Sequence, residues 1–126
     1  MTPCLRLLVL KTHELVGLVQ FYEALGFEFA EERHGNGPIH YSTRLGESVL
    51  EIYPLPTGVS DESHVRLGFA LSNPDRIVAE IASLGGTLVK SGRETPWGYM
   101  AIVADPDGRV IELYRAMDAS DAVSNE

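Results

Sequence analysis

The first half of the chain changes its hydrophobic spacing several times, and each change predicts a new element. The short apolar run Leu5–Leu10 predicts a strand, because it is too short for a stable helix. Apolar residues then recur at helical spacing as far as Leu25, and Gly26 stands where a helix would end. Three strands separated by turns complete this half. They are expected at Phe27–Glu32, Ile39–Leu45 and Ser48–Tyr53.

The second half repeats this order of elements. Val65–Leu71 predicts a strand, and Asn73 followed by Pro74 is the preferred start of a helix. The apolar stripe of that helix reaches Leu84, where two glycines end it. Three strands follow, and an Asp-Pro-Asp-Gly turn joins the last two. They are expected at Thr87–Lys90, Trp97–Ala104 and Val110–Tyr114.

The two halves also match residue by residue, which indicates an internal repeat. Val49–Tyr53 and Val110–Tyr114 both read apolar-apolar-Glu-apolar-Tyr, at an offset of 61 residues. Each half alone is too small to bury its sheet face, so we expect an α+β fold in which two βαβββ modules form a cupped mixed sheet around a shared cavity. The expected bounds are about 5–55 and 64–116 for the modules, 1–116 for the single domain and 117–126 for a disordered acidic tail.

Composition narrows the range of partners. With 18 Asp and Glu against 10 Lys and Arg, the 126-residue chain has a formal net charge of −8, which argues against nucleic acid because Lys and Arg carry that affinity. No apolar run approaches the roughly 20 residues of a membrane span, and no secretory signal is expected. The single cysteine, Cys4, excludes an internal disulfide, and His13, His34 and His40 show no ligand spacing with one another. We therefore expect a cytoplasmic protein that binds neither nucleic acid nor membrane.

Four stretches, in this order along the chain, resemble one known family. They are Phe21–Phe27 (FYEALGF), Val49–Ile52 (VLEI), Pro96–Gly98 (PWG) and Asp105–Leu113 (DPDGRVIEL). On paired βαβββ modules they make the chain similar, over about Leu5 to Arg115, to the vicinal-oxygen-chelate superfamily of glyoxalase I, bleomycin-resistance proteins and extradiol dioxygenases. The resemblance implies a cupped sheet around a cavity, commonly in a homodimer.

Enzymes of that family bind a divalent metal through one residue on the first and last strand of each module. Carried onto this sequence by spacing from the motifs, the four positions are Leu7, Glu51, Arg66 and Glu112. Leucine has no lone pair and arginine is always protonated, so neither can coordinate. Because a tight site needs about three protein ligands, we expect no metal cofactor. His64 should face the same side of its strand as Arg66. It either lies hydrated at the mouth of the sheet without a role, which we favour, or restores a divalent site through a register shift of two residues.

Glu51, Arg66 and Glu112 should all point into the cavity. A buried carboxylate or guanidinium without a partner is costly, so we predict a Glu–Arg–Glu cluster in which the arginine replaces the charge of the metal. Two roles stay open for this cluster. It is either a salt-bridged structural plug, or a polar floor that binds a ligand group and supplies a catalytic carboxylate from Glu51 or Glu112.

Aromatic residues are expected around the two glutamates. Tyr53 and Tyr114 share their faces by strand alternation, and Trp97, Tyr99 and Tyr41 lie nearby in the repeat. These side chains either line an apolar pocket for a flat ligand or take part in ordinary sheet packing. The residues assigned to ligand binding are Arg66, His64, Tyr53, Trp97, Tyr99 and Tyr114.

Three functions fit these residues. The first is a metal-independent protein of the bleomycin-resistance type, which binds a small molecule in a cavity at or near a dimer interface. The alternative is a metal-dependent lyase, isomerase or dioxygenase that uses Glu51 and Glu112, or a metal-free enzyme with one glutamate as general base. The third is a structural or regulatory dimer module without a small ligand.

Overall fold

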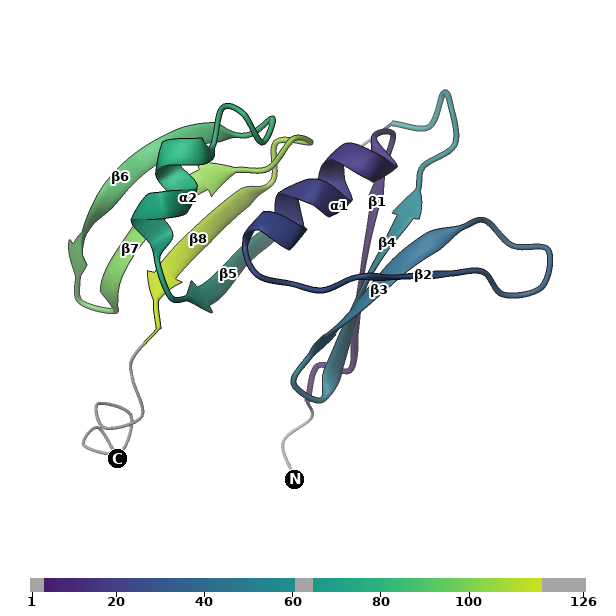
Figure 1. Ribbon diagram of the computed structural model, residues 1–126, viewed down its shortest axis with the longest axis horizontal. Helices are drawn as coiled ribbons and strands as arrows, with labels where there is room; N and C mark the ends of the chain where they lie inside the picture. Colours follow the sequence, from purple (N-terminus) through teal and green to yellow (C-terminus); the bar gives the residue numbers. More distant parts are fainter. Residues whose placement is uncertain (1–3, 61–64, 117–126) are drawn as a thin grey trace. The chain divides into compact units, whose positions relative to one another are not determined.

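The computed structural model describes residues 4–60 and 65–116, and the chain divides into two compact units, Met1–Ser63 and His64–Glu126. Each unit has one four-stranded mixed sheet and one helix, in the order β-α-β-β-β (Figure 1). The α+β class and the two βαβββ modules are therefore confirmed. The cavity shared between the modules stays a prediction, and the expected tail, 117–126, lies outside the described residues.

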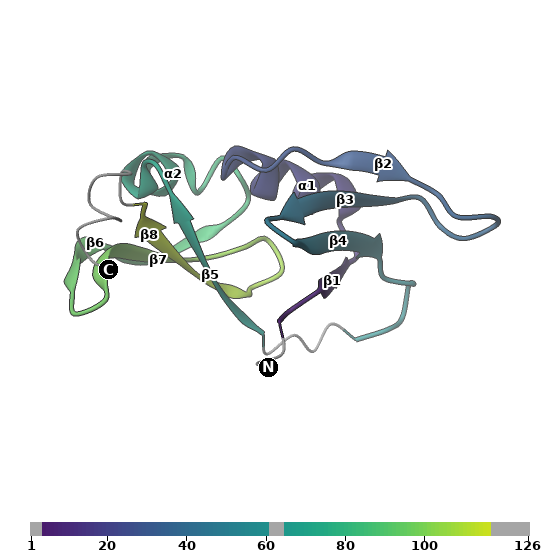
Figure 2. The same ribbon diagram turned by 90° about the horizontal axis from the view of Figure 1, so that it is seen from below.

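The first unit builds its sheet around a parallel pair of strands. β1 (Leu7–Thr12) lies beside β4 (Ser48–Pro54), and α1 (Leu15–Ala24) connects β1 to β2 (Ala30–Glu32). β3 (His40–Leu45) pairs antiparallel with both β2 and β4, which gives the strand order β1-β4-β3-β2. Figure 2 shows the β2–β3 hairpin, whose loop projects beyond the end of β4.

The second unit repeats this topology. β5 (Arg66–Leu71) runs parallel to β8 (Val110–Arg115), and α2 (Pro74–Glu80) leads to β6 (Thr87–Thr95). β7 (Gly98–Ala104) pairs antiparallel with β6 and β8, so the strand order is β5-β8-β7-β6. The internal repeat seen in the sequence is therefore a repeat of strand connections as well as of residues.

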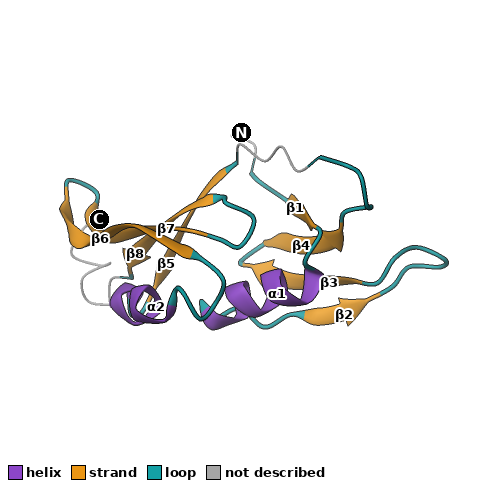
Figure 3. Cartoon of the chain, turned by 90° about the horizontal axis from the view of Figure 1, so that it is seen from above, coloured by secondary structure: helices purple, strands orange, loops and turns teal. Residues whose placement is uncertain are grey.

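Each helix covers one face of its own sheet (Figure 3). Leu50 and Ile52 of β4 are fully buried with the apolar side of α1, whereas Glu51 between them is only partly buried. Since strand side chains alternate, Glu51 lies on the face away from the helix. β8 shows the same alternation, with Glu112 between Ile111 and Leu113. We call this side of each sheet its helix-free face.

Two predicted strands have different bounds in the structure. The strand expected from Phe27 begins only at Ala30. The alternation that suggested an earlier start reflects the packing of Phe27 against Phe29, whose ring centroids are 6.4 Å apart. Conversely, β6 does not stop at Lys90 but continues to Thr95. Two register shifts against β7 disturb its alternation, which hid the second half of the strand from the sequence pattern.

The second helix is shorter than predicted. It begins as expected, with the Asn73 side chain accepting a hydrogen bond from the Arg76 backbone N–H. However, it ends at Glu80 instead of Leu84, because the following turns are held by tighter bonds such as Ile81 N–H to the Val78 carbonyl. Within the described ranges, no helix is long and apolar enough to cross a membrane.

The Asp-Pro-Asp-Gly turn has a structural role that positions β8. Asp105 Oδ1 accepts hydrogen bonds from the backbone N–H groups of Asp107 and Arg109. The Arg109 side chain folds back over the turn, with Nη1 3.1 Å from Asp105 and 3.0 Å from Asp107. Arg109 and Asp105 are almost completely buried, and the sequence analysis did not foresee this ion pair. The turn fixes the start of the strand that carries Glu112.

Candidate functional site

The four positions that the family resemblance marks form two equivalent pairs. Across β1 and β4, Leu7 lies beside the residue two positions before Glu51. Across β5 and β8, Arg66 lies beside the residue two positions before Glu112. Leu7 and Arg66 therefore occupy the same place in their respective units, as the sequence spacing predicted.

In the second unit, Arg66, Glu112 and Tyr114 form a connected polar group. Arg66 Nε donates to Glu112 Oε2 over 2.7 Å, and the Tyr114 hydroxyl donates to Glu112 Oε1 over 2.5 Å. The side chain of Arg66 is 57% exposed and that of Glu112 is 23% exposed. Both carboxylate oxygens of Glu112 thus have a donor, while the guanidinium stays accessible.

This arrangement changes the acidity of two groups. The hydrogen bond from Tyr114, followed by that from Arg66, holds the pKa of Glu112 below its ordinary value, although partial burial opposes the shift. The same hydrogen bond raises the pKa of the Tyr114 hydroxyl, because the phenolate form would lose it and face the carboxylate. Glu112 is therefore held as a carboxylate that accepts hydrogen bonds, not as a poised acid.

In the first unit, the equivalent positions border a groove. The groove has a volume of about 730 Å³ and is lined by the start of β1 and by residues of β3 and β4. Leu7, Val49 and Glu51 contribute its wall, together with the charged side chains of Arg44 and Glu47. Its size lies within the roughly 300–1,000 Å³ of typical small-molecule sites. Leu7 is half exposed and adds apolar surface where a metal ligand would stand in the family enzymes.

A histidine that the sequence analysis set aside lies next to Glu51. His40 Nε2 is 3.9 Å from Glu51 Oε2 and 3.3 Å from the Tyr53 hydroxyl. Its ring is stacked on that of Tyr53, with centroids 4.1 Å apart and planes at 7°. The expectation that the histidines share no ligand spacing is therefore wrong for His34 and His40, which meet at Glu32. The turn predicted around His34 was the available signal, because a hairpin brings its two flanks together.

The aromatic residues assigned to ligand binding separate into three groups. Tyr53 and Tyr114 lie on the helix-free faces with the glutamates. Tyr99 is instead on the opposite side of its sheet, where its hydroxyl donates to Asp75 over 2.7 Å. Trp97 is 77% exposed in the turn between β6 and β7. Of these four described residues, Tyr53 lies on the same face as Glu51 and Tyr114 on the same face as Glu112, whereas Tyr99 and Trp97 lie away from the glutamate of their unit.

Of the predicted Glu–Arg–Glu cluster, the structure shows the contact between Arg66 and Glu112. Both residues lie within the second unit. The link to Glu51 joins the two units and stays a prediction. His64, the candidate replacement ligand, lies outside the described residues.

The residues at the four family positions do not fit a metal. Glu51 and Glu112 offer carboxylate oxygens, but Leu7 offers no donor atom and Arg66 brings a fixed positive charge to the oxygen that a metal would use. Two carboxylates fall short of the three protein ligands of an open catalytic site. No step of a reaction is therefore assigned to a metal at these positions.

The chain belongs to the glyoxalase/bleomycin resistance protein/dioxygenase superfamily. The family model matches residues 11–113, which include both helices and all the strands except the first four residues of β1 and the last two of β8. No curated protein matches this sequence.

Several solved structures share the fold at low sequence identity. A glyoxalase/bleomycin resistance protein/dioxygenase family enzyme of Burkholderia phytofirmans PsJN is 20% identical, with a TM-score of 0.66, over 88% of this chain and 97% of that chain. A glyoxalase-related enzyme of Fulvimarina pelagi is 20% identical, with a TM-score of 0.68, over 91% and 89%. TnmS3, an antibiotic binding protein from Streptomyces sp. CB03234, is 21% identical, with a TM-score of 0.68, over 92% and 98%.

Proposed function

We propose that this protein binds a small organic molecule without a metal at the four family positions. The bond from Arg66 to Glu112 is the observation that supports this most directly. It places a permanent positive charge on the carboxylate that would otherwise hold a cation, so the electrostatic role of the metal is already filled. Such a site can bind and orient a ligand, but it offers no Lewis acid for lyase, isomerase or dioxygenase chemistry.

The groove of the first unit is the proposed location of the ligand. Leu7 and Val49 provide apolar contact, and Glu51 provides a hydrogen-bond acceptor at the same wall. Tyr53 lies on the same strand face as Glu51 but outside the lining of the groove, with its ring stacked on His40. The groove therefore combines apolar contact with charged groups such as Glu51 and Arg44, and polar groups of this kind fix the orientation of a bound ligand.

The proposed ligand class is flat, partly aromatic small molecules, antibiotics included. TnmS3, an antibiotic binding protein with a similar fold, supports this choice. Fold similarity alone does not fix function, so the class has to be tested directly.

Thermal unfolding in the presence of a panel of aromatic antibiotics and related small molecules is the test. A compound that binds only the native state at 100 times its Kd adds about 2.7 kcal/mol of stability. For a domain of this size that corresponds to a rise in Tm of at least roughly 5 °C. Hits are then titrated by calorimetry against wild type, Glu51→Gln and Arg76→Met, whose arginine lies on the exposed side of α2 and serves as the control. Glu51→Gln should weaken binding and Arg76→Met should not.

The alternative is a metal-dependent enzyme that uses Glu51 and Glu112. Metal analysis of protein purified without added metal separates the two functions, provided that it includes Glu112→Gln. A stoichiometric metal that this substitution removes would overturn the proposal, and so would a panel in which no compound raises Tm.

We also infer a homodimer, because the family resemblance implies one and because a ligand at a dimer interface would gain walls from both chains. Light scattering after gel filtration gives the mass directly. A mass near 13.8 kDa at working concentration would contradict the dimer.

A further inference from the structure

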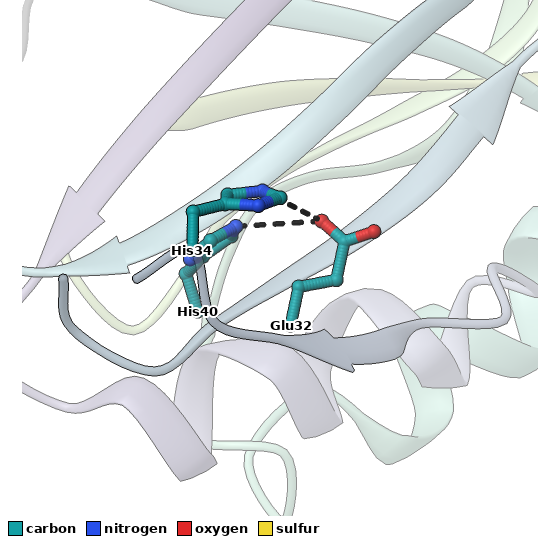
Figure 4. Close-up of side chains that lie close together, drawn as sticks. All are labelled: Glu32, His34 and His40. Atoms are coloured by element: carbon teal, nitrogen blue, oxygen red, sulfur yellow. Dashed lines mark ion pairs between the residues drawn. The ribbon is translucent and has the colours of Figure 1, made fainter. Parts of the chain in front are cut away.

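Three potential metal ligands meet on the β2–β3 hairpin of the first unit (Figure 4). The register of the hairpin places Glu32 directly opposite His40, and the loop after β2 brings His34 to the same carboxylate. Glu32 Oε1 is 3.3 Å from His40 Nε2 and 3.9 Å from His34 Nε2. One donor atom from each residue therefore lies within 4.8 Å of the other two.

His40 is held in an orientation that suits coordination. Its side chain is 1% exposed and its ring is stacked on Tyr53. Nδ1 lies 3.2 Å from the carbonyl oxygen of Pro38, which can only accept a hydrogen bond, so Nδ1 carries a proton. In the neutral ring Nε2 then has the lone pair. Histidines that bind metals commonly show this pattern, since a hydrogen bond from the second ring nitrogen fixes tautomer and ring orientation.

The surroundings of His40 Nε2 are rich in oxygen. Besides Glu32, the Tyr53 hydroxyl lies at 3.3 Å and the Glu51 carboxylate at 3.9 Å. The Tyr53 hydroxyl can donate a hydrogen bond to this lone pair, but the two carboxylates beside it bring negative charge to the same place. A bound cation would balance that charge.

The geometry points to a binding site for a divalent transition-metal ion formed by Glu32, His34 and His40, with zinc as the ion that fits best. Two imidazole nitrogens and one carboxylate oxygen are a known donor set of zinc sites that keep a fourth position open. Bond lengths of about 2.0–2.2 Å around a tetrahedral ion separate the donors by roughly 3.3–3.6 Å. The separations of 3.3 and 3.9 Å are close to this range.

To bind an ion at these bond lengths, the ring of His34 has to move slightly closer to Glu32. The His34 side chain is 74% exposed and lies in a loop, so its ring can turn toward the ion at little cost in packing. Glu51 Oε2 is near enough to His40 to take the fourth position or to hold a water molecule there. Glu51 belongs to β4 and not to the hairpin, and among the four family positions it is the one with a contact to a described residue of the cluster, His40.

Glu51 borders both this zinc site and the proposed ligand groove, whereas Glu32, His34 and His40 do not line the groove, so their variants test the zinc site separately. The zinc site lies entirely within the first unit and uses neither Leu7 nor the Arg66–Glu112 pair. The experiment is titration of the full chain, dialysed against chelator and then buffer, with zinc chloride in a calorimeter. Wild type should bind one zinc ion per chain. Loss of a residue that only supports a metal ligand costs about 10–100-fold in metal affinity. Because His34 is proposed as a direct ligand, His34→Ala should weaken zinc affinity by more than that.

Two further variants sharpen the test. His13→Ala removes a histidine of the same unit whose Nε2 lies 2.9 Å from the Val59 carbonyl oxygen, away from the cluster, and it should bind zinc as wild type does. Glu112→Gln should also bind normally, which separates this site from the family positions. Cobalt in place of zinc should give the intense visible absorption of a tetrahedral site, and His34→Ala should abolish it.

Several results would contradict the proposed zinc site. Wild type that shows no saturable zinc binding, or equal affinity in wild type and His34→Ala, would mean that Glu32, His34 and His40 do not form a zinc site. Zinc binding that disappears in His13→Ala or Glu112→Gln would place the ion elsewhere and would also refute the assignment. Because His34 is exposed, its replacement should leave the unfolding temperature of the metal-free protein unchanged, which confirms that the variant is folded.

Discussion

Arg66 and Glu112 are joined by a 2.7 Å hydrogen bond between the parallel strands β5 and β8, at two of the four positions that the family resemblance marks as metal-ligand positions. The pair places a fixed positive charge against a carboxylate on the helix-free face of the second unit. Since the guanidinium is more than half exposed, its energetic contribution is that of a surface ion pair, and its importance lies in the charge that it presents.

A double-mutant cycle should measure this interaction. Arg66→Met combined with Glu112→Gln should give a coupling energy of about 0.2–1 kcal/mol in urea unfolding, reduced in high salt because exposed charges are screened. Arg76→Met combined with Glu112→Gln is the matched control and should show no coupling. A second cycle, between Arg66 and Glu51, tests the predicted three-residue cluster, and zero coupling there would contradict it.

The acidity of Glu112 should depend on Tyr114. Tyr114→Phe removes the hydrogen bond that contributes most to the lowered pKa, so the pKa of Glu112 should rise. A lowered pKa stabilises the fold above the unfolded-state value, and that contribution is lost as pH falls through the folded-state value. The stability difference between wild type and Tyr114→Phe should therefore shrink on acidification. NMR titration of the side-chain carboxyl gives the pKa, and an unchanged value in the variant would refute the assignment.

The Asp105–Arg109 ion pair should be a major contribution to stability. Both side chains are buried, so Arg109→Met leaves a buried carboxylate without its cation, at a cost of about 3–5 kcal/mol. Arg93→Met, at an exposed position of β6, should change the free energy of unfolding by less than about 0.5 kcal/mol. Chemical unfolding of both variants decides the matter, and equal stabilities would show that the turn does not need its arginine.

Two glycine substitutions should have opposite signs. A Cβ at Gly92 would overlap the Tyr99 hydroxyl and lie 2.6 Å from Asp75 Oδ1, so Gly92→Ala should destabilise the fold by about 1–3 kcal/mol. Gly17 lies within α1 with room for a methyl group, so Gly17→Ala should stabilise it by roughly 0.5–1 kcal/mol. Thermal unfolding compares the two. A neutral Gly92→Ala would mean that Tyr99 and Asp75 can separate without loss.

The sequence predicted correctly those helices and strands whose apolar residues recur at one regular interval. The helix beginning at Leu15 and the strand containing Glu51 have regular apolar periods and clear turn residues at their ends, so their existence followed from the sequence. β6 was cut short because its register shifts break the alternation on which such predictions rest. The second helix was extended too far because Ile81 is buried by a turn and not by a helix, and burial alone does not distinguish them.

By itself, the sequence determined the repeated βαβββ order, the family and the presence of Leu7 and Arg66 at two of the four family positions, because these depend on which residues are present and on their spacing. Only the tertiary structure decided that Arg66 bonds Glu112 and that His40 stands beside Glu32. Those contacts join residues 46 and 8 positions apart in the chain, and strand register, not local spacing, sets their distance. The register is fixed by packing of the whole sheet against its helix, which no short stretch of sequence contains.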